Sequence, residues 1–326
     1  MTAKLLRLVP TIIAFAFAMC AAQAQPSHYP DRPITMIVTF AAGGSSDVLA
    51  RAVARAMSQG LGQQIVVENR PGAGGNIGAE AVSKAAPDGY TILFGTNGTL
   101  GIGPALYKNL RYNPQKDLMP VGLLHQLPLV LIVNPQVPAK SLGELIAYAK
   151  SNPGKLTFAS AGIGSASHLT AELFKIAAGI DILHIPYKGG GAATADLISG
   201  QVSMMLETIP NALPLVRNGQ MRALGVTTKE RSVNALDLPA FAESGLPKFD
   251  ISAWTGLFVP AGTPKAIIER LNAETIRIAS DPAYIAQIRN MGADVASSSA
   301  DAFGAFVRKD VANWTEAIQR SGTRVE

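Results

Sequence analysis

The sequence predicts an α/β protein with mostly parallel strands, divided into two domains. From residue 34 onward, apolar segments of strand length alternate with segments of helix length, as in a parallel sheet covered by helices. The chain has 326 residues, which is more than a single hydrophobic core normally serves. A strand followed by a Gly-containing turn and a Ser-rich helix start occurs twice, far apart in the chain.

The first residues have the pattern of an export signal. Lys4 and Arg7 precede an apolar run over residues 8–19, and Ala22-Gln-Ala24 has the small residues of a signal-peptidase site. We therefore expect cleavage after Ala24 and secretion of the mature chain. An uncleaved membrane anchor is the alternative, but the apolar run is short for a bilayer.

Cysteine content and charge exclude several classes of protein. Cys20 is the only cysteine, so a mature chain contains no disulfide, thiol nucleophile or cysteine metal site. Lipidation of Cys20 is disfavoured by Met19, which stands where a lipoprotein signal normally needs Gly or Ala. The chain has 28 basic and 23 acidic residues, and two of the basic residues are lost with the signal. The mature chain therefore has a net charge of 28 − 2 − 23 = +3. This scattered charge predicts no nucleic-acid partner.

The first strand–turn–helix unit predicts an anion-binding turn. Residues 34–40 form an apolar run that suits a strand buried on both faces, and residues 48–57 follow as a helix. Between them, Gly43-Gly44 allows a tight turn, and Ser45-Ser46-Asp47 suits a helix start. The N–H groups at such a start favour an anion. An ordinary strand–helix turn without a ligand is the alternative.

The second unit repeats this device. Residues 156–161, which include Ser160, predict a strand. Gly162 and Gly164 predict a turn, and Ser165 predicts the start of a helix that continues over residues 169–178. Two helix starts far apart in the chain could face each other across a cleft. They would then hold one small anion from both sides.

Further elements follow the first unit. We expect strands over residues 64–68 and 90–94, and a helix over residues 77–86 that Asn76 caps. The second of these strands ends in Gly95-Thr96-Asn97-Gly98. Such a polar, Gly-lined strand end borders the ligand crevice in open α/β sheets.

Two segments are expected to cross between the domains. Residues 121–133 form a long apolar segment that contains Pro128, and residues 221–227 are expected to form a strand that crosses back. The remaining predicted strands cover residues 182–187, 202–206 and 249–259, and the remaining helices follow Ser141, cover residues 192–198, precede Asn218 and begin at Pro264.

The residue inventory argues against catalysis. No metal-ligand spacing occurs among the four histidines, His28, His125, His168 and His184. No Gly-x-Ser-x-Gly elbow or P-loop is present. Gly162-x-Gly164 lacks the third glycine of a dinucleotide loop, and Tyr187-Lys188 replaces the expected acidic residue. We therefore expect no metal and no cofactor.

Two residues of the Gly-containing turns have two interpretations each. His168 is interpreted as an orienting or packing residue, and a general base is the alternative. Asp47 is interpreted as a cap, because its charge would compete with a bound anion. The amides of Gly43, Gly44 and Ser45 are therefore the better ligands.

Two further residues are ambiguous. Glu207 could accept a hydrogen bond from a ligand amine or hydroxyl, or it could be a solvated strand end. Trp254 suits the hydrophobic core better than a pocket.

The motifs together resemble one known family. Phe40-Ala-Ala-Gly-Gly-Ser-Ser-Asp47, Val67-Glu-Asn-Arg-Pro-Gly-Ala-Gly-Gly75 and Gly164-Ser-Ala-Ser-His168 are similar to motifs of the tripartite tricarboxylate transporter receptors, also called Bug proteins. Other matching segments are residues 86–90, 184–189, 222–227 and 254–256. The resemblance covers essentially the whole mature chain in order.

The resemblance implies a periplasmic, type II solute-binding fold with two lobes and a hinge. Each lobe would be a mostly parallel sheet flanked by helices, and two crossover strands would form the hinge. We place the signal peptide at residues 1–24, lobe one at residues 25–124 and 229–326, and lobe two at residues 125–228. The family captures small carboxylates mainly through backbone amides and ordered waters of the two Gly-rich loops, and a tripartite membrane transporter is the implied partner.

Two departures from the family pattern lie where the far end of a ligand is read. Leu206-Glu-Thr208 has Glu where many members have Asp, and Gly189-Gly-Gly-Ala192 lacks the proline common before that helix. The identity of the carboxylate therefore stays open.

We predict a monomeric receptor that binds a small organic carboxylate by lobe closure and catalyses no reaction. A periplasmic enzyme that acts on a carboxylate with the same two-lobed fold is the alternative. The predicted ligand-binding residues are Phe40, Ala42, Gly43, Gly44, Ser45, Asp47, Thr96, Asn97, Ser160, Gly162, Gly164, Ser165, His168, Tyr187 and Glu207.

Overall fold

Strands from both ends of the chain join in one hydrogen-bonded sheet in the computed structural model, which describes residues 29–40, 42–107, 109–187 and 190–321. The strands lie in the order β2 (Ile65–Asn69), β1 (Ile34–Val38), β3 (Thr91–Thr96), β9 (Ser252–Pro260), β4 (Leu118–Val133), β7 (Met204–Thr208), β5 (Thr157–Ser160) and β6 (Leu183–Pro186). Two further strands, β8 (Arg222–Val226) and β10 (Asp294–Val295), also pair with β4. The predicted signal peptide, with Cys20 and the cleavage site, lies outside the described residues. No helix of the described residues is long and apolar enough to cross a membrane.

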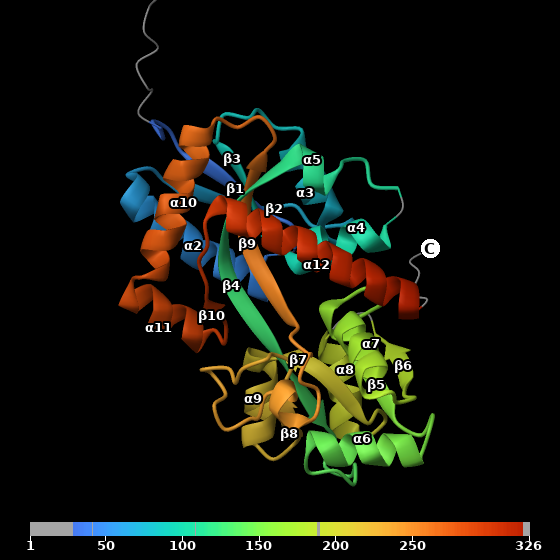
Figure 1. Cartoon of the computed structure of the whole chain (residues 1–326). Helices are drawn as coiled ribbons and strands as arrows, with labels where there is room; N and C mark the ends of the chain where they lie inside the picture. The colour runs from blue at the N-terminus through green and yellow to red at the C-terminus, as the bar shows by residue number, and fades with distance from the viewer. Residues whose placement is uncertain (1–28, 41, 108, 188–189, 322–326) are drawn as a thin grey trace, which may run out of the picture. The chain divides into compact units, whose positions relative to one another are not determined.

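The first half of the sheet contains the first predicted unit (Figure 1). Strand β1 (Ile34–Val38) pairs in parallel with β2 (Ile65–Asn69) and β3 (Thr91–Thr96), and β3 pairs with β9 (Ser252–Pro260) in the antiparallel direction. The flanking helices are α2 (Ser45–Leu61), α3 (Asn76–Ser83), α10 (Lys265–Ala279), α11 (Pro282–Asn290) and α12 (Ala300–Ser321). Their apolar faces cover β1, β3 and β9, which are buried on both sides as the unbroken apolar runs predict, whereas the edge strand β2 is partly exposed.

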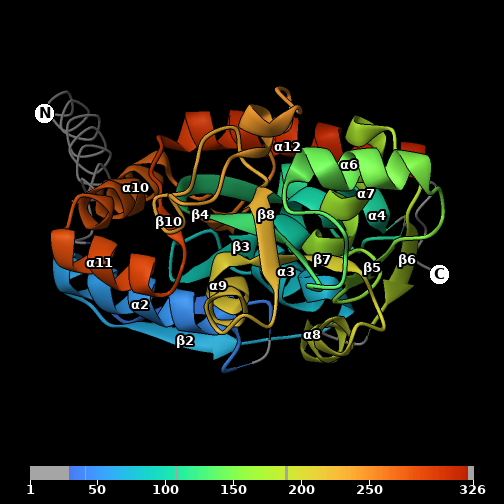
Figure 2. The same ribbon diagram turned by 90° about the horizontal axis from the view of Figure 1, so that it is seen from below.

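The second half of the sheet contains the second predicted unit. Its central strand β5 (Thr157–Ser160) pairs in parallel with β6 (Leu183–Pro186) and β7 (Met204–Thr208). The helices are α6 (Leu142–Ser151), α7 (Ala166–Ala178), α8 (Gly190–Ser199) and α9 (Ile209–Arg217). Figure 2 shows α6 on one side of these strands and α8 and α9 on the other.

Strand β4 (Leu118–Val133) runs through both halves (Figure 1). Its first part pairs with β9, and its last five residues pair with β7. In this last part, Leu129 and Leu131 face one hydrophobic core and Val130 and Ile132 face another, because side chains alternate along a strand. Residues 121–133 therefore lie in one strand that pairs in both halves of the sheet, and Pro128 does not interrupt it. That this strand crosses between two lobes stays a prediction.

The second predicted crossing segment is wrong. Residues 221–227 contain β8 (Arg222–Val226), which pairs with residues 130–133 of β4 and stays in the second half. The strand that returns to the first half is β9, whose first residue, Ser252, pairs with Pro128. Antiparallel pairs of β4 and β9 also make the sheet mixed where we expected it to be mostly parallel.

The connection between β8 and β9 packs with the second half. Phe241, Leu246 and Phe249 belong to the same hydrophobic core as Phe158 and Phe174. The sequence prediction had assigned residues 229–251 to lobe one, because a strand at residues 221–227 was expected to carry the chain back. The division into lobes stays a prediction, with its second boundary shifted to β9.

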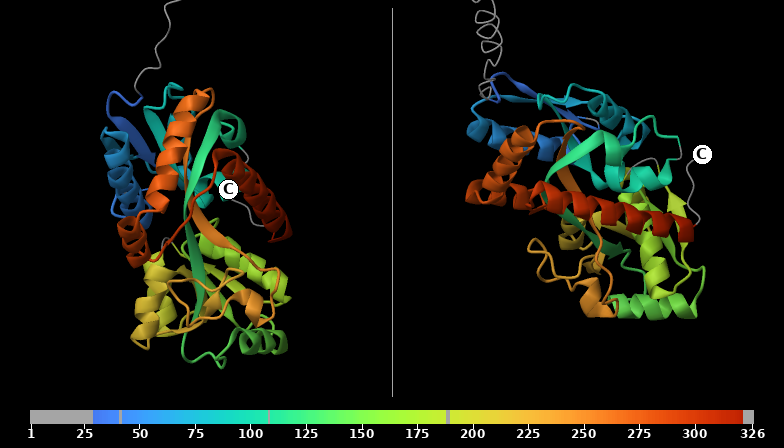
Figure 3. Two further views of the ribbon diagram at one scale, coloured as in Figure 1. Left: turned by 60° about the vertical axis from the view of Figure 1, so that its left-hand side comes forward. Right: turned by 45° about the horizontal axis from the view of Figure 1, so that its top comes forward.

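The C-terminal helix α12 contacts both halves (Figure 3). A small hydrophobic cluster joins Ile102 and Leu106 from the first half, Leu169 of α7, and Trp314 and Ile318 of α12. Several short elements that the sequence analysis did not predict complete the chain: η1 (Ala73–Gly75), η2 (Asn97–Ile102), α4 (Gly103–Leu106), α5 (Pro114–Asp117), η3 (Phe241–Ser244) and β10 (Asp294–Val295).

Candidate functional site

The first Gly-containing turn follows β1 and leads into α2. Gly43 has a φ of +81°, a left-handed conformation that favours glycine. Gly44 is the N-cap of α2, so the helix begins at Ser45, three residues earlier than predicted, and no side chain caps it. The N–H of Gly43 donates to Oδ2 of Asp47 at 2.9 Å.

Asp47 is a buried carboxylate that ties the turn to its neighbours. Nε of Arg51 donates to Oδ2 at 3.0 Å, and Nδ2 of Asn69 donates to Oδ1 at 3.0 Å. Burial raises the pKa of Asp47, but the hydrogen bonds from Arg51, Gly43 and Asn69 outweigh burial and hold that pKa below its usual value. Asp47 is therefore ionised and its charge is balanced by Arg51.

These bonds change the expected donors of the first turn. Gly43 was predicted to offer its amide to a ligand, but that amide is bonded to Asp47. Within the described part of the chain, no acceptor lies at hydrogen-bond distance from the amides of Gly44, Ser45 and Ser46. These are the orphan amides of a helix start. Ala42, Gly44 and Ser45 are exposed, and Phe40 is partly buried.

The end of β3 brings a polar cluster beside this turn. Oγ1 of Thr96 accepts from the N–H of Thr99 at 3.3 Å, and Oγ1 of Thr99 lies 3.3 Å from Oγ1 of Thr39. Asn97 is only 4 % exposed, and its Nδ2 has no hydrogen-bond partner among the described residues. Such an unsatisfied buried donor costs about 1–3 kcal/mol, which a ligand or a water would recover.

The second turn is closed by its own side chains. Gly162 donates its N–H to Oγ of Ser160 at 3.2 Å, and Gly164 donates to Nδ1 of His168 at 3.1 Å. Ser165 is the N-cap of α7, and its Oγ accepts from the N–H of His168. The amides of Gly162 and Gly164 are therefore bonded internally, contrary to our expectation that they hold a ligand. Ala166 and Ser167 carry the unpaired amides of this helix start, as far as the described residues show.

Three parallel rings lie beneath the second turn. The ring centroids of His168 and His184 are 4.0 Å apart with an interplanar angle of 17°, and His184 stacks on Phe158 at 4.6 Å. Nε2 of His184 lies 2.7 Å from Oγ of Ser160. Burial, together with the charge of Lys175, lowers the pKa of each imidazole to about 4. These contacts fit the interpretation of His168 as an orienting residue.

Sequence reasoning missed His184, Phe158 and Arg51 as parts of the site. His184 and Phe158 are register partners on β6 and β5, so only the strand pairing brings their rings together. Arg51 offered a signal, because it stands four residues after Asp47 on one helix face. Thr170, whose Oγ1 is buried without a partner in the described structure, gave no signal.

Tyr187 and Glu207 lie in the second half of the sheet, and the polar atoms of both side chains form hydrogen bonds with neighbouring residues. The hydroxyl of Tyr187 donates to Asp196 at 2.7 Å, which raises the pKa of Tyr187 to about 12. Glu207 is only 9 % exposed, so it is not a solvated strand end. Its Oε1 accepts from the N–H of Thr208 at 2.7 Å and from Nδ2 of Asn211 at 3.3 Å.

Trp254 belongs to the core, as expected. It is fully buried, and its Nε1 donates to Asp310 at 2.7 Å. No group of three His, Cys, Asp or Glu side chains among the described residues is placed to hold a metal ion.

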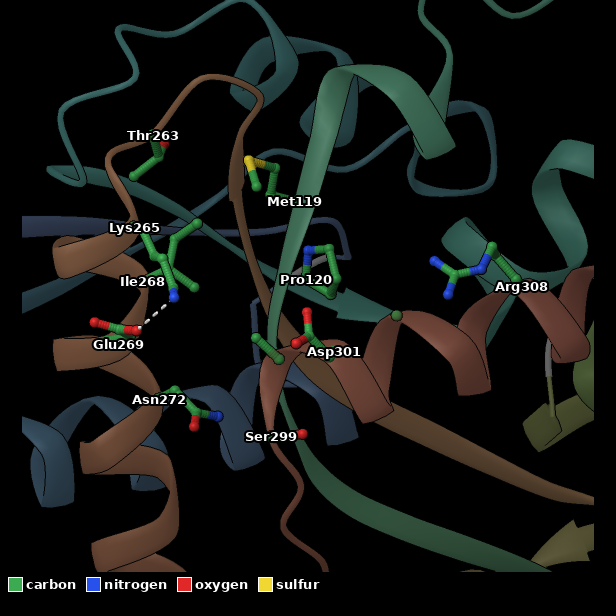
Figure 4. A pocket seen from close by; sticks show the side chains of 12 residues that line it. Met119, Pro120, Thr263, Lys265, Ile268, Glu269, Asn272, Ser299, Asp301 and Arg308 are labelled. Carbon is green, nitrogen blue, oxygen red and sulfur yellow. Dashed lines mark ion pairs between the residues drawn. The ribbon is translucent and has the colours of Figure 1, made fainter.

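A separate pocket of about 750 Å³ opens beside the starts of α10 and α12 (Figure 4). Lys265 pairs with Glu269 at 3.4 Å in this pocket, and both side chains are largely exposed. Nδ2 of Asn272 donates to the carbonyls of Val121 and Ser298. None of the predicted ligand-binding residues lines it.

Comparisons with known proteins match these observations. The model of the tripartite tricarboxylate transporter family receptor matches residues 49–323. Protein BugT of Bordetella pertussis is 38 % identical over 315 residues, which cover 96 % of this chain and 97 % of BugT. The resemblance stated from the motifs is thereby confirmed. The family and its structural neighbours are solute-binding receptors, which confirms the prediction of a receptor and not an enzyme.

Two solved structures with bound carboxylates have the same fold. Rpa4515 of R. palustris with adipate is 33 % identical, with a TM-score of 0.79 over 91 % of this chain and 99 % of that chain. MatC of Rhodopseudomonas palustris with bound malate is 37 % identical, with a TM-score of 0.74 over 89 % of this chain and 100 % of that chain. The mixed α/β fold is that of solute-binding proteins.

Proposed function

The chain belongs to the tripartite tricarboxylate transporter family of receptors, and from this premise we propose that it binds a small organic carboxylate between the two Gly-containing turns. The observation that carries the proposal is the pair of helix starts after β1 and β5, each with unbonded amides. Unpaired N–H groups and the positive end of a helix dipole favour an anion.

A neutral site suits this ligand. Neither turn contains Lys or Arg, and Arg51 beside the first turn is bonded to Asp47. The carboxylate charge is therefore met by dipoles, directly or through ordered water. The relatives with bound adipate and malate support a dicarboxylate as the first ligand to examine.

We further propose that the two halves of the sheet act as lobes that close on the ligand. A carboxylate on one turn alone would stay exposed to water, where a single dipole contributes little. A ligand that contacts both turns stabilises the closed form through these additional contacts. Strands β4 and β9, which pair along the middle of the sheet, are the connections that would bend.

The location and the partner follow from the same premise. A mature chain that begins at Gln25 would act in the periplasm as a monomer and deliver its ligand to a tripartite membrane transporter. The mass of the protein isolated from its native compartment tests the first part. Retention of Met1, or a lipid on Cys20, would contradict it.

A thermal-shift and calorimetry panel tests the ligand class. We expect a dicarboxylate or tricarboxylate at one hundred times its dissociation constant to stabilise the protein by about 2.7 kcal/mol. The dimethyl ester of the same acid is the matched control and should produce no shift. The proposal is wrong if no mono-, di- or tricarboxylate, amino acid or aromatic acid binds, or if ester and acid bind equally.

A further inference from the structure

Both Gly-containing turns are held by the same hydrogen bond. Gly43 donates to Asp47 at 2.9 Å, and Gly164 donates to His168 at 3.1 Å. Each acceptor stands four residues after its glycine, and the two glycines have φ values of +81° and +80°. The repeated geometry indicates that this bond fixes the left-handed turn that presents the following amides.

The two acceptors differ in chemistry. Asp47 is a carboxylate held ionised by Arg51, so its Oδ2 accepts a hydrogen bond over the whole neutral and mildly acidic range. His168 accepts only while Nδ1 carries no proton, because an imidazolium donates from both nitrogens. The bond from Gly164 therefore assigns the proton of neutral His168 to Nε2.

The surroundings of His168 keep it neutral. The ring of His184 lies parallel to it with centroids 4.0 Å apart, so two imidazolium rings would repel each other. Nζ of Lys175 lies 5.9 Å from the ring centroid of Phe158, beneath His184, and Lys175 itself pairs with Glu172 at 3.3 Å. Strand β5, which also packs here, carries no ionisable side chain. Glu172 stands four residues after His168 on α7, but its carboxylate pairs with Lys175. In the described structure, a proton on His168 would thus be buried without a bonded acidic partner.

We infer that His168 is a positioning residue whose uncharged imidazole holds the second turn in place by accepting the hydrogen bond from Gly164, a contact we call the latch. We infer further that protonation of His168 at acidic pH breaks the latch and weakens ligand binding. This inference rests on the proposed function. Protonation would convert the acceptor of the Gly164 amide into a donor, so the turn would lose the bond that the first turn keeps through Asp47. The low pKa of both imidazoles, about 4, places the change at acidic pH.

The first turn suggests a variant of His168 that keeps the hydrogen-bond acceptor but cannot be protonated. His168→Asn places an amide oxygen at the position of Nδ1, where it can accept from Gly164 without titrating, much as Oδ2 of Asp47 does in the first turn. His168→Leu removes the acceptor. His184→Gln can keep the bond to Ser160 while it removes the neighbouring titratable ring.

The first measurement needs no ligand. Amide NMR spectra of the mature protein are recorded from pH 7.5 to 3, and the shift of the Gly164 amide is followed, with the Gly43 amide as the internal control. We expect the Gly164 signal of the wild type to titrate toward acidic pH and to stay in place in His168→Asn. In His184→Gln its midpoint should rise, since the charge of His184 lowers the pKa of His168.

The second measurement uses malate and adipate as probes. For each protein, the affinity at a given pH is divided by the affinity of the same protein at pH 7.5. The ratio for the wild type is then divided by the ratio for His168→Asn at the same pH. This quotient cancels the effect of protonation of the probe. We expect this quotient to fall up to tenfold for each pH unit below the midpoint.

Each measurement can refute a different part of the inference. A Gly164 amide that does not titrate, or that titrates equally in His168→Asn, overturns the latch. A quotient that stays constant or rises toward acidic pH overturns its effect on binding. Absence of probe binding by every variant at pH 7.5 would contradict the proposed function, while the ligand-free spectra would still decide whether the latch exists.

Discussion

His125 and Tyr284 share a hydrogen bond of 2.7 Å between Nε2 and the phenolic oxygen, at a place closed to solvent. The other ring nitrogen, Nδ1, lies 2.8 Å from Oγ1 of Thr255. A single imidazole on β4 thus connects β9 and α11. Both of its nitrogens are used, so protonation would give it a second donor without a buried acid to balance the charge.

The buried histidines predict a loss of stability in acid. Burial lowers the pKa of His125 to about 3, below the 6.5 of an exposed histidine. The unfolded chain therefore binds the proton first, so stability is complete above pH 6.5 and falls as the pH drops toward 3. For one fully buried histidine this amounts to roughly 2–4 kcal/mol at pH 4.

Thermal unfolding of the wild type and His125→Gln between pH 7.5 and 4 checks this prediction. Glutamine can keep one hydrogen bond but does not titrate, so the variant should start less stable and lose less stability in acid. Equal slopes for both proteins would show that His125 does not carry the effect.

Replacing Asn97 should separate binding from stability. Its Nδ2 is buried and lacks a partner in the described structure, so Asn97→Leu removes an unsatisfied donor and should not lower the free energy of unfolding. If Asn97 contacts the ligand, affinity should fall by tenfold or more. Thr170→Val is the parallel variant for the other unsatisfied atom. A stable Asn97→Leu protein with unchanged affinity would remove Asn97 from the site.

Alanine substitutions at two glycines with similar left-handed backbone conformations test whether the first turn binds the ligand. Gly43 and Gly62 have φ values of +81° and +70°, and a Cβ on either would meet no atom within 4 Å. Alanine should therefore cost about 1 kcal/mol of stability at both positions, through the backbone alone. Only Gly43→Ala should weaken carboxylate binding, because Gly62 ends α2 far along the helix from Gly43. Calorimetry on both variants decides, and an equal loss of affinity would point to a general effect of strain.

Lobe closure predicts a change in dimensions. X-ray scattering of the mature protein should give a smaller radius of gyration when a saturating dicarboxylate is added. The bending should be confined to β4 and β9, where the two halves of the sheet meet. An unchanged radius with a tightly bound ligand would show that the two turns do not close on it.

Local sequence patterns predicted most of the elements but not the way they cross. The strand–Gly–helix units were predictable because strand burial, glycine and helix-start residues agree at both places. The returning strand was misplaced because residues 221–227 and 249–259 both have strand patterns. Pairing with β4, together with the packing of Phe241 and Phe249, keeps the first of these in the second half.

The site shows the same limit. The glycines were found from the sequence, yet the amides of Gly43, Gly162 and Gly164 are bonded to side chains that stand up to four residues away. A sequence specifies which residues can accept a hydrogen bond, but not which acceptor reaches a given amide. The stacking of His168 on His184 depends on the pairing of β5 with β6 and on the packing of α7 against β5, so it was not predictable from spacing.

The central claim is that one carboxylate ligand is held by both helix starts. The most direct measurement is a titration of the labelled mature protein with malate or adipate, in which the amide signals of Gly44, Ser45 and Ser46 are followed together with those of Ala166 and Ser167. We expect both groups of signals to shift with the same dissociation constant, because one ligand contacts both turns. Saturation of the protein with only one group shifting, or with neither, would contradict the claim.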